Sequence, residues 1–190
     1  MKASQTKQKD PLKIRSYSIF GAIVWTLLLA FMLLSNIKTI EKEALNRAYI
    51  YTQVGFDKDV LYRRWVAEHG GVYVKIDSTT PPNPYLSHIP DRDLVLDSNI
   101  RLTLLNPAYM TRQVYELQEA SSEVRGHITS LNPIRDANEP DKWEISALLS
   151  FEEGAEEYSG IDTLDGKAYF RYMKPFITEA SCLKCHAKDG

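Results

Sequence analysis

The segment from Tyr17 to Ile37 contains no charged side chain. Its length matches the ~20 apolar residues that an α-helix needs to cross the hydrocarbon core of a bilayer. A buried core helix of a soluble domain is a weaker interpretation, because no polar face interrupts the run. The sequence therefore predicts a transmembrane anchor over 17–37.

Basic residues precede this apolar run. They are Lys2, Lys7, Lys9, Lys13 and Arg15. Because Lys and Arg are retained on the cytoplasmic side of a membrane helix, we expect residues 1–16 in the cytoplasm. Residues 38–190 are then expected beyond the bacterial inner membrane, in the periplasm. A cleaved signal peptide is the alternative, but no A-x-A-like site of small residues follows the run. Both interpretations export the C-terminal region.

The segment Cys182-Leu183-Lys184-Cys185-His186 has the spacing C-x-x-C-H, which is typical of c-type haem attachment. Two thiols add to the two vinyl groups of one porphyrin, and the adjacent imidazole binds the iron. We therefore expect one covalent haem c on Cys182 and Cys185, with His186 as the proximal axial ligand. Haem c is attached outside the bacterial inner membrane, so the two ends of the sequence agree.

The cysteine count limits the alternatives to haem, because the chain has 2 cysteines and both lie in this motif. A structural zinc site usually needs four protein ligands, which a Cys-Cys-His set does not supply. A thiol–disulfide pair is a second alternative. Such a pair usually opens a helix in a thioredoxin-like βαβ pattern, which this sequence does not have.

Hydrophobic periodicity indicates an α+β domain after the anchor. We expect a long amphipathic helix over 36–68, ended by Gly70-Gly71, whose aromatic residues (Tyr49, Tyr51, Phe56, Tyr62 and Trp65) pack in a core. Alternation predicts strands over 71–76 and 124–131, and 101–105 is expected to be either a short strand or a lead-in to the next helix. A helix capped by Asn106 should run to about Ala120. Asp141 and Glu144 form a capping box that predicts a second helix, and 158–177 reads as a hairpin turning at Asp165-Gly166.

Six stretches of the exported region carry a resemblance to a known family. They are HGGVYV (69–74), NPYL (83–86), NPAYMTR (106–112), GHITSLNP (126–133), PDKWE (140–144) and MKP (173–175), followed by CLKCHA. In this order they resemble bacterial membrane-anchored periplasmic haem-c sensor domains of PAS-like fold. Such domains are found ahead of histidine kinases, chemotaxis receptors and cyclases.

The resemblance implies a PAS-like antiparallel-sheet domain over 38–190 that senses redox state or a diatomic ligand and feeds signal transduction. In such sensors the chain continues through a further strand and a second membrane helix into a signalling module. This chain ends at Gly190, so we expect a fragment or a free-standing haem protein. The alternative is a membrane-tethered c-type cytochrome for electron transfer. Small cytochromes are mostly helical with an early haem motif, so a mixed domain with a late motif favours the sensor.

The sixth position of the iron has several candidate ligands, in the order His127, Met110 and His69. His88 is excluded because it lies in a proline-rich loop. His127 would give a bis-histidine iron of low potential, and Met110 a His/Met iron of higher potential; core packing is the other interpretation of Met110. An iron without a sixth ligand would favour gas binding. The cations expected near the haem propionates are Arg112, Arg125 and Arg171.

The remaining expectations concern partners and chemistry. The chain has 23 Lys and Arg residues against 25 Asp and Glu residues. This nearly neutral charge balance predicts no nucleic-acid surface. The apolar stripe of the helix from Asn36 indicates a homodimer, and the resemblance implies a signalling partner. No Ser/His/Asp or paired-carboxylate constellation stands out, so we expect a binding module and not an enzyme.

Overall fold

The computed structural model describes residues 11–97 and 99–177 of the chain. Cys182, Cys185 and His186 lie outside the described residues. The chain divides into two compact units, the first ending at Ala48 and the second beginning at Tyr49.

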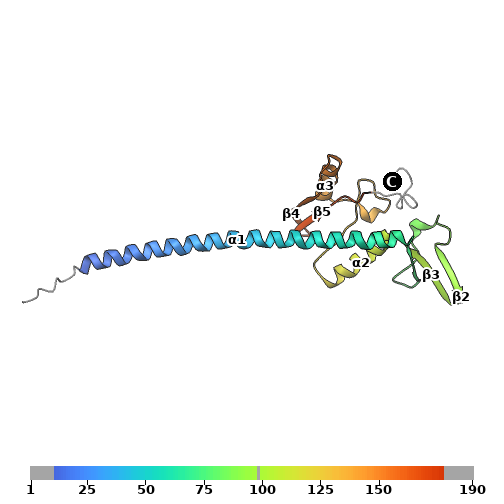
Figure 1. Ribbon diagram of the computed structural model, residues 1–190, viewed down its shortest axis with the longest axis horizontal. Coiled ribbons are helices and arrows are strands. Elements are labelled where there is room, and N and C mark those ends of the chain that lie inside the picture. Colours follow the sequence, from blue (N-terminus) through green and yellow to red (C-terminus); the bar gives the residue numbers. More distant parts are fainter. Residues whose placement is uncertain (1–10, 98, 178–190) are drawn as a thin grey trace, which may run out of the picture. The chain divides into compact units, whose positions relative to one another are not determined.

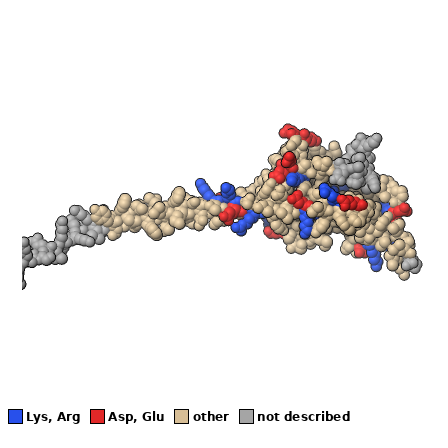
Figure 2. All heavy atoms as spheres, in the orientation of Figure 1, with Lys and Arg blue, Asp and Glu red and all other residues tan. Residues whose placement is uncertain are grey.

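Helix α1 (Pro11–Glu68) begins in the first unit and continues into the second (Figure 1). The anchor expected over 17–37 and the helix expected over 36–68 are therefore parts of one helix. Large apolar side chains of the anchor face outward, such as Trp25 at 64% and Phe31 at 71% exposure. Figure 2 shows this charge-free length of the helix. In the described chain, one helix is long and apolar enough to cross a membrane, with a mean hydropathy of 2.2 over an 18-residue window.

The second unit contains two antiparallel sheets. Strands β1 (Val72–Lys75), β2 (Asp93–Asp97) and β3 (Ile100–Leu105) form a three-stranded sheet of order β1-β3-β2. Strands β4 (Tyr158–Leu164) and β5 (Lys167–Met173) form a hairpin. Its turn has positive φ at both Asp165 (52°) and Gly166 (78°), which is the geometry that a two-residue hairpin turn favours. The predicted hairpin is confirmed.

Two shorter helices begin at the caps that the sequence predicts. Helix α2 (Pro107–Ser121) starts after Asn106, whose side chain accepts a hydrogen bond from the backbone N of Tyr109 at 2.9 Å. Helix α3 (Lys142–Glu152) starts with the capping box: Asp141 accepts from the backbone N of Glu144 at 2.8 Å, and Glu144 accepts from that of Asp141 at 2.9 Å. Short 3₁₀ turns η1 (Pro84–Leu86) and η2 (Asp136–Asn138) complete the fold. The α+β class is confirmed.

The buried core of the second unit is small. Its apolar members, each less than a tenth exposed, are Val66, Leu86, Leu105, Tyr109 and Ala147. Polar contacts supplement them between α1 and α2: the hydroxyl of Tyr115 donates to Asp59 at 2.8 Å, and Arg63 donates to Thr111 Oγ1 at 3.3 Å. The last turns of α1 are therefore fixed to the start and middle of α2.

The strand expected over 124–131 is wrong, because this described segment has no regular secondary structure. Side-chain hydrogen bonds hold this segment, instead of the backbone hydrogen bonds of a β-ladder. Thr129, for example, donates to the carbonyl of Asn138 at 2.8 Å. Strand β2, by contrast, was not predicted. Its sequence DLVLD lies between a proline-rich loop and β3, and its pairing with β3 is irregular between Val95 and Asp97.

The expected core packing of the α1 aromatics holds in part. Tyr49 and Phe56 meet Tyr172 edge-to-face, with ring centroids 5.7 and 6.2 Å apart. The expectation is wrong for the other three, because Tyr51, Tyr62 and Trp65 are 64%, 50% and 54% exposed. The exposed pair Tyr62 and Trp65 borders the site described next.

Candidate functional site

The chain that leads to the C-x-x-C-H motif lies along α1. Phe176 stacks on Phe56 with centroids 5.2 Å apart, and the Arg63 guanidinium lies 4.6 Å from the centre of the Phe176 ring. Upstream, the hydroxyls of Tyr49 and Tyr172 both donate to Glu157, at 2.7 and 3.0 Å. These contacts fix the end of the described chain beside Arg63.

Covalent geometry then limits where the two cysteines can reach. Cys182 is five positions after Ile177 in the sequence, and an extended chain spans at most ~3.6 Å per position, or about 18 Å in all. An α-helix rises only ~1.5 Å per residue. The final turns of α1, and whatever packs on them, therefore lie within reach of the attachment motif.

An apolar hollow of about 320 Å³ lies at these final turns. Helix α1 contributes Tyr62, Trp65 and Val66, and α2 contributes Met110. The remaining walls are Val72, Val74 and Leu105 of β1 and β3. A more open hollow of about 570 Å³ adjoins it, shares Tyr62 and Trp65, and lies along α1 alone. The first volume falls within the ~300–1,000 Å³ of typical ligand sites.

Met110 is held by a rigid start of α2. Its neighbours Tyr109 and Thr111 are 3% and 2% exposed. The hydroxyl of Tyr109 donates to the carbonyl of Pro81 at 2.6 Å, and that of Thr111 donates to the carbonyl of Pro107 at 2.8 Å. The half-buried Met110 thus lines the hollow from a fixed backbone.

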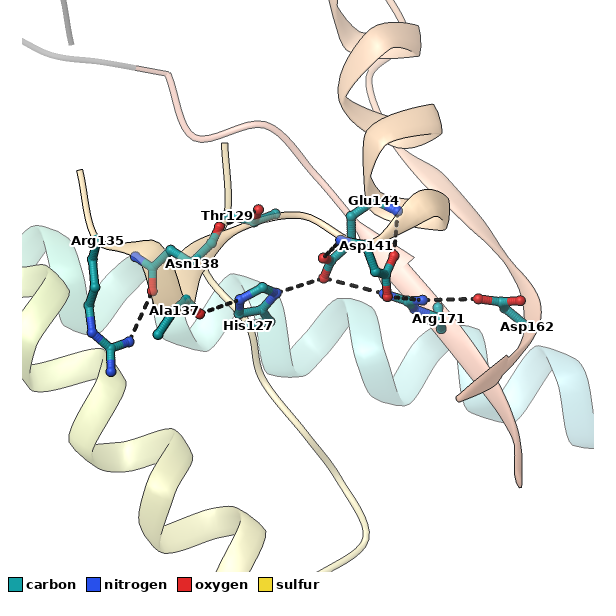
Figure 3. Close-up of polar contacts among 9 residues, drawn as sticks. All are labelled: His127, Thr129, Arg135, Ala137, Asn138, Asp141, Glu144, Asp162 and Arg171. Atoms are coloured by element: carbon teal, nitrogen blue, oxygen red, sulfur yellow. Dashed lines mark hydrogen bonds and ion pairs between the residues drawn. The ribbon is translucent and has the colours of Figure 1, made fainter. Parts of the chain in front are cut away.

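His127 lies in a polar network and not at the hollow (Figure 3). Its Nδ1 is 2.8 Å from Oε1 of Glu144, and its Nε2 is 3.3 Å from the carbonyl of Ala137. The hydrogen bond to Glu144 raises the pKa of His127, although burial acts in the opposite direction. With both ring nitrogens engaged, neither presents a free lone pair to a metal.

Arg171 is the centre of the same network. Its Nη1 lies 2.7 Å from Asp141 and 3.0 Å from Asp162, and its Nη2 lies 3.3 Å from Glu144. Burial is the largest single effect and raises the pKa of Asp141, but the hydrogen bond and charge of Arg171 together with backbone hydrogen bonds from α3 outweigh it, so the pKa of Asp141 is lowered. The guanidinium also lies 4.5 Å from the centre of the Trp143 ring. The network joins the 124–140 segment, α3 and the β4–β5 hairpin.

The other two arginines expected at the propionates also have carboxylate partners. Arg125 lies 3.0 Å from Asp165 and 3.4 Å from Glu119. Arg112 lies 3.6 Å from Glu116, and its guanidinium is 4.3 Å from the centre of the Tyr109 ring. Arg112 is thus two residues from Met110 on α2, whereas Arg125 contacts Asp165 in the turn of the β4–β5 hairpin and Arg171 belongs to β5.

The remaining histidines occupy different environments. His69 follows α1, with its Nδ1 2.7 Å from the carbonyl of Trp65 and its ring 4.3 Å from that of Trp65. Because a carbonyl only accepts, Nδ1 carries the proton and Nε2 keeps its lone pair. His88 is exposed and lies between η1 and β2. His69 is thus near one wall of the hollow, and its Nε2 remains chemically able to bind a metal ion.

The Tll0287-like family model matches residues 42–189. The chain belongs to the Tll0287-like family. The matched range begins within α1 and includes the C-x-x-C-H segment. No curated protein matches the chain, and no solved structure matches it either.

The described residues of this Tll0287-like chain fit a haem. The hollow has apolar walls, and Met110 is one of its lining residues. Within 11–97 and 99–177, no group of three or more His, Cys, Asp and Glu side chains could hold a bare metal ion.

Sequence reasoning missed two features of this Tll0287-like site. The exposed aromatics Tyr62 and Trp65 line the hollow, and their positions in the last turns before the Gly70-Gly71 stop were an available signal. Glu144 serves both as a capping residue and as the partner of His127 and Arg171. The capping-box pattern identified the first role, while the second depends on packing that no local pattern encodes.

Proposed function

We propose that this chain is a haem-c-binding sensor module held to the bacterial inner membrane by the apolar part of α1. Cys182 and Cys185 would carry one haem through thioether bonds, and His186 would be the proximal ligand. When bound, the haem supplies a one-electron iron couple and an axial position for a diatomic ligand. The C-x-x-C-H spacing inside the family match over 42–189 carries the proposal.

The proposed location is the periplasm, with residues 1–16 in the cytoplasm. Basic residues before the apolar run support this orientation. Haem c is attached outside the inner membrane, which supports the same location. A helix with the length and hydropathy to cross a membrane is present in the described chain.

The walls of the hollow support a sensor more than an electron carrier. Tyr62 and Trp65 belong to α1, the same helix that contains the apolar segment. A change in iron ligation would alter the packing of these two side chains, and a helix transmits such a change along its axis. A carrier needs no such connection. We propose a binding role and no enzymatic one.

The exposed apolar side chains of α1 support a proposal about the binding partners of the chain. Tyr51 and Val54 are 64% and 61% exposed in the second unit. Apolar side chains exposed at this spacing support a homodimer through α1. A signalling partner is the further proposal, drawn from the resemblance of the exported region to modules that precede kinases, receptors and cyclases.

The test uses the full chain, matured with haem and purified in detergent. Hydrogen exchange of the backbone over 58–68 is measured in the ferric state, in the ferrous state, and in the ferrous state with CO or NO. The sensor proposal predicts that exchange in these turns changes with redox state or ligand. A control chain with Cys182→Ala and Cys185→Ala should show no such response.

Two results would contradict this function. Exchange over 58–68 that is identical in all states, together with rapid electron transfer to redox partners, would favour the tethered cytochrome. Absence of haem from the matured chain would refute both functions.

A further inference from the structure

We propose that Met110 Sδ is the sixth ligand of the iron, and that the porphyrin lies against the hollow between α1, β1 and α2. This inference rests on the proposed haem function and specifies the side chain opposite His186. Among the described lining residues, Met110 and Tyr62 carry atoms of types that serve as axial ligands. A phenol must lose a proton to bind iron, whereas a thioether binds it without any proton loss, which favours Met110.

One arginine connects the haem tether to Met110. The Arg63 guanidinium lies 4.6 Å from the centre of the Phe176 ring, and its Nη1 donates to Thr111 Oγ1 at 3.3 Å. Phe176 is six residues before Cys182 (182 − 176), and Thr111 adjoins Met110. The path to the haem cysteines therefore starts one side chain away from α2, and an extended chain of this length spans about 20 Å.

The backbone around Met110 is suited to hold an axial ligand. Its N donates to the carbonyl of Asn106 at 3.0 Å, inside the first turn of a capped helix. Buried Tyr109 and Thr111 fix the turn on both sides. The flexible side chain of Met110 can adjust its sulfur position while the helix stays in place.

The competing donors are less well placed. His127 has both ring nitrogens engaged, by Glu144 and by the carbonyl of Ala137, and does not line the hollow. His69 keeps a lone pair on Nε2, but its side chain is exposed and it too lies outside the lining. If His127 gave up these partners to bind iron, the charge of buried Glu144 would also be less compensated. Met110 already lines the hollow.

A thioether ligand has a functional consequence. Methionine favours ferrous iron more than imidazole does, so a His/Met iron has a higher reduction potential than a bis-histidine iron. Met110 is half-buried and lines the hollow. A neutral thioether ligand can be displaced by CO or NO, which would connect gas binding to the position of α2.

The test compares Met110→Leu with Met173→Leu in the full, haem-loaded chain. Met173 is the matched control, since it is half-buried in β5 and is the other methionine that follows the anchor. Met110→Leu should lose the thioether-to-iron charge-transfer band of the ferric spectrum and the low-spin signature. Its reduction potential should change, while Met173→Leu should match wild type.

Met110→His provides a readout that requires a folded protein. This variant should retain a six-coordinate, low-spin iron and show a lower reduction potential. An unchanged ferric spectrum in Met110→Leu, or loss of the low-spin signature in His127→Gln or His69→Ala instead, would overturn the assignment. Wild-type chain lacking covalent haem would refute the proposed function, and the ligand assignment with it. Haem-loaded wild type with an unaffected Met110→Leu would refute this inference alone.

Discussion

Nδ1 of His127 lies 2.8 Å from Oε1 of Glu144, whose side chain is 7% exposed. The same carboxylate accepts from the backbone of Asp141 and lies 3.3 Å from Arg171. A buried carboxylate therefore joins the irregular 124–140 segment to α3 and β5 (Figure 3). This arrangement gives the histidine a structural role and makes that role dependent on pH.

Stability should depend on His127 more strongly at low pH than at high pH. The hydrogen bond to Glu144 raises the pKa of His127 against the opposing effect of burial, with Asp141 adding to the rise. A raised folded-state pKa gives stability that is fully present below the unfolded value of about 6.5 and is lost as pH rises through the folded value. The imidazole is 38% exposed, so solvent screening limits this contribution to about 1 kcal/mol.

The measurement compares His127→Gln with wild type by chemical unfolding at about pH 5.5 and about pH 9, on either side of the histidine range. The difference in unfolding free energy should be larger at the lower pH. His88→Gln, in the exposed loop, is the control and should show no such dependence. A His127→Gln difference that grows as pH rises would contradict the account.

Removing Arg171 should destabilise the second unit. The side chain is 14% exposed and faces Asp141, Glu144 and Asp162. Arg171→Leu leaves these carboxylates without their shared cation, which costs about 3 kcal/mol for a buried pair. Arg125→Leu, at 41% exposure, should cost under about 1 kcal/mol. Equal losses of unfolding free energy in the two variants would show that the network is not a buried one.

Substitution of Gly126 should disturb the packing of the 124–140 segment. A Cβ at this position would lie 2.5 Å from ring atoms of Tyr115, whose hydroxyl donates to Asp59 of α1. Gly126→Ala should therefore destabilise by about 1–3 kcal/mol, the usual cost of overpacking. Gly160→Ala is the control, because a Cβ there meets nothing within 4 Å. Thermal unfolding that ranks Gly160→Ala as the more harmful change would refute this contact.

Phe176 should affect the iron without affecting haem attachment. Its ring stacks on Phe56 and lies under Arg63, so Phe176→Ala releases the tether from α1. The matured variant should carry covalent haem in normal amount but show a smaller low-spin fraction in its ferric spectrum. Ile177→Ala, at 79% exposure, should resemble wild type. Loss of the low-spin state in both variants would indicate a general disturbance of the tether.

Local signals in the sequence were sufficient to predict the helices that have capping residues and the hairpin that has a defined turn. Asn106, the pair Asp141 and Glu144, and Asp165-Gly166 each fix backbone geometry within a few residues, and the corresponding helices and hairpin are confirmed. The segment 124–131 alternates like a strand, yet the described segment pairs with none. Its side-chain bonds to η2 and α3 replace a ladder, and such long-range partners leave no local pattern.

The sequence predicts the chemistry of the site but not its arrangement. The C-x-x-C-H spacing predicts the attachment residues, whereas the order of His127 and Met110 as ligands depends on neighbouring side chains. Glu144 and Ala137 engage His127 from other elements, and the hollow around Met110 combines α1, β1, β3 and α2. Neither environment follows from residue spacing.

The most direct test of the account is the intact mass of the full chain produced with a cytochrome c maturation system, measured with its pyridine haemochrome spectrum. We predict the mass of one added haem and the spectrum of haem held by two thioether bonds. Cys182→Ala/Cys185→Ala should have the mass of the polypeptide alone. A wild-type chain with no added mass after maturation would contradict the central claim that this protein holds haem c.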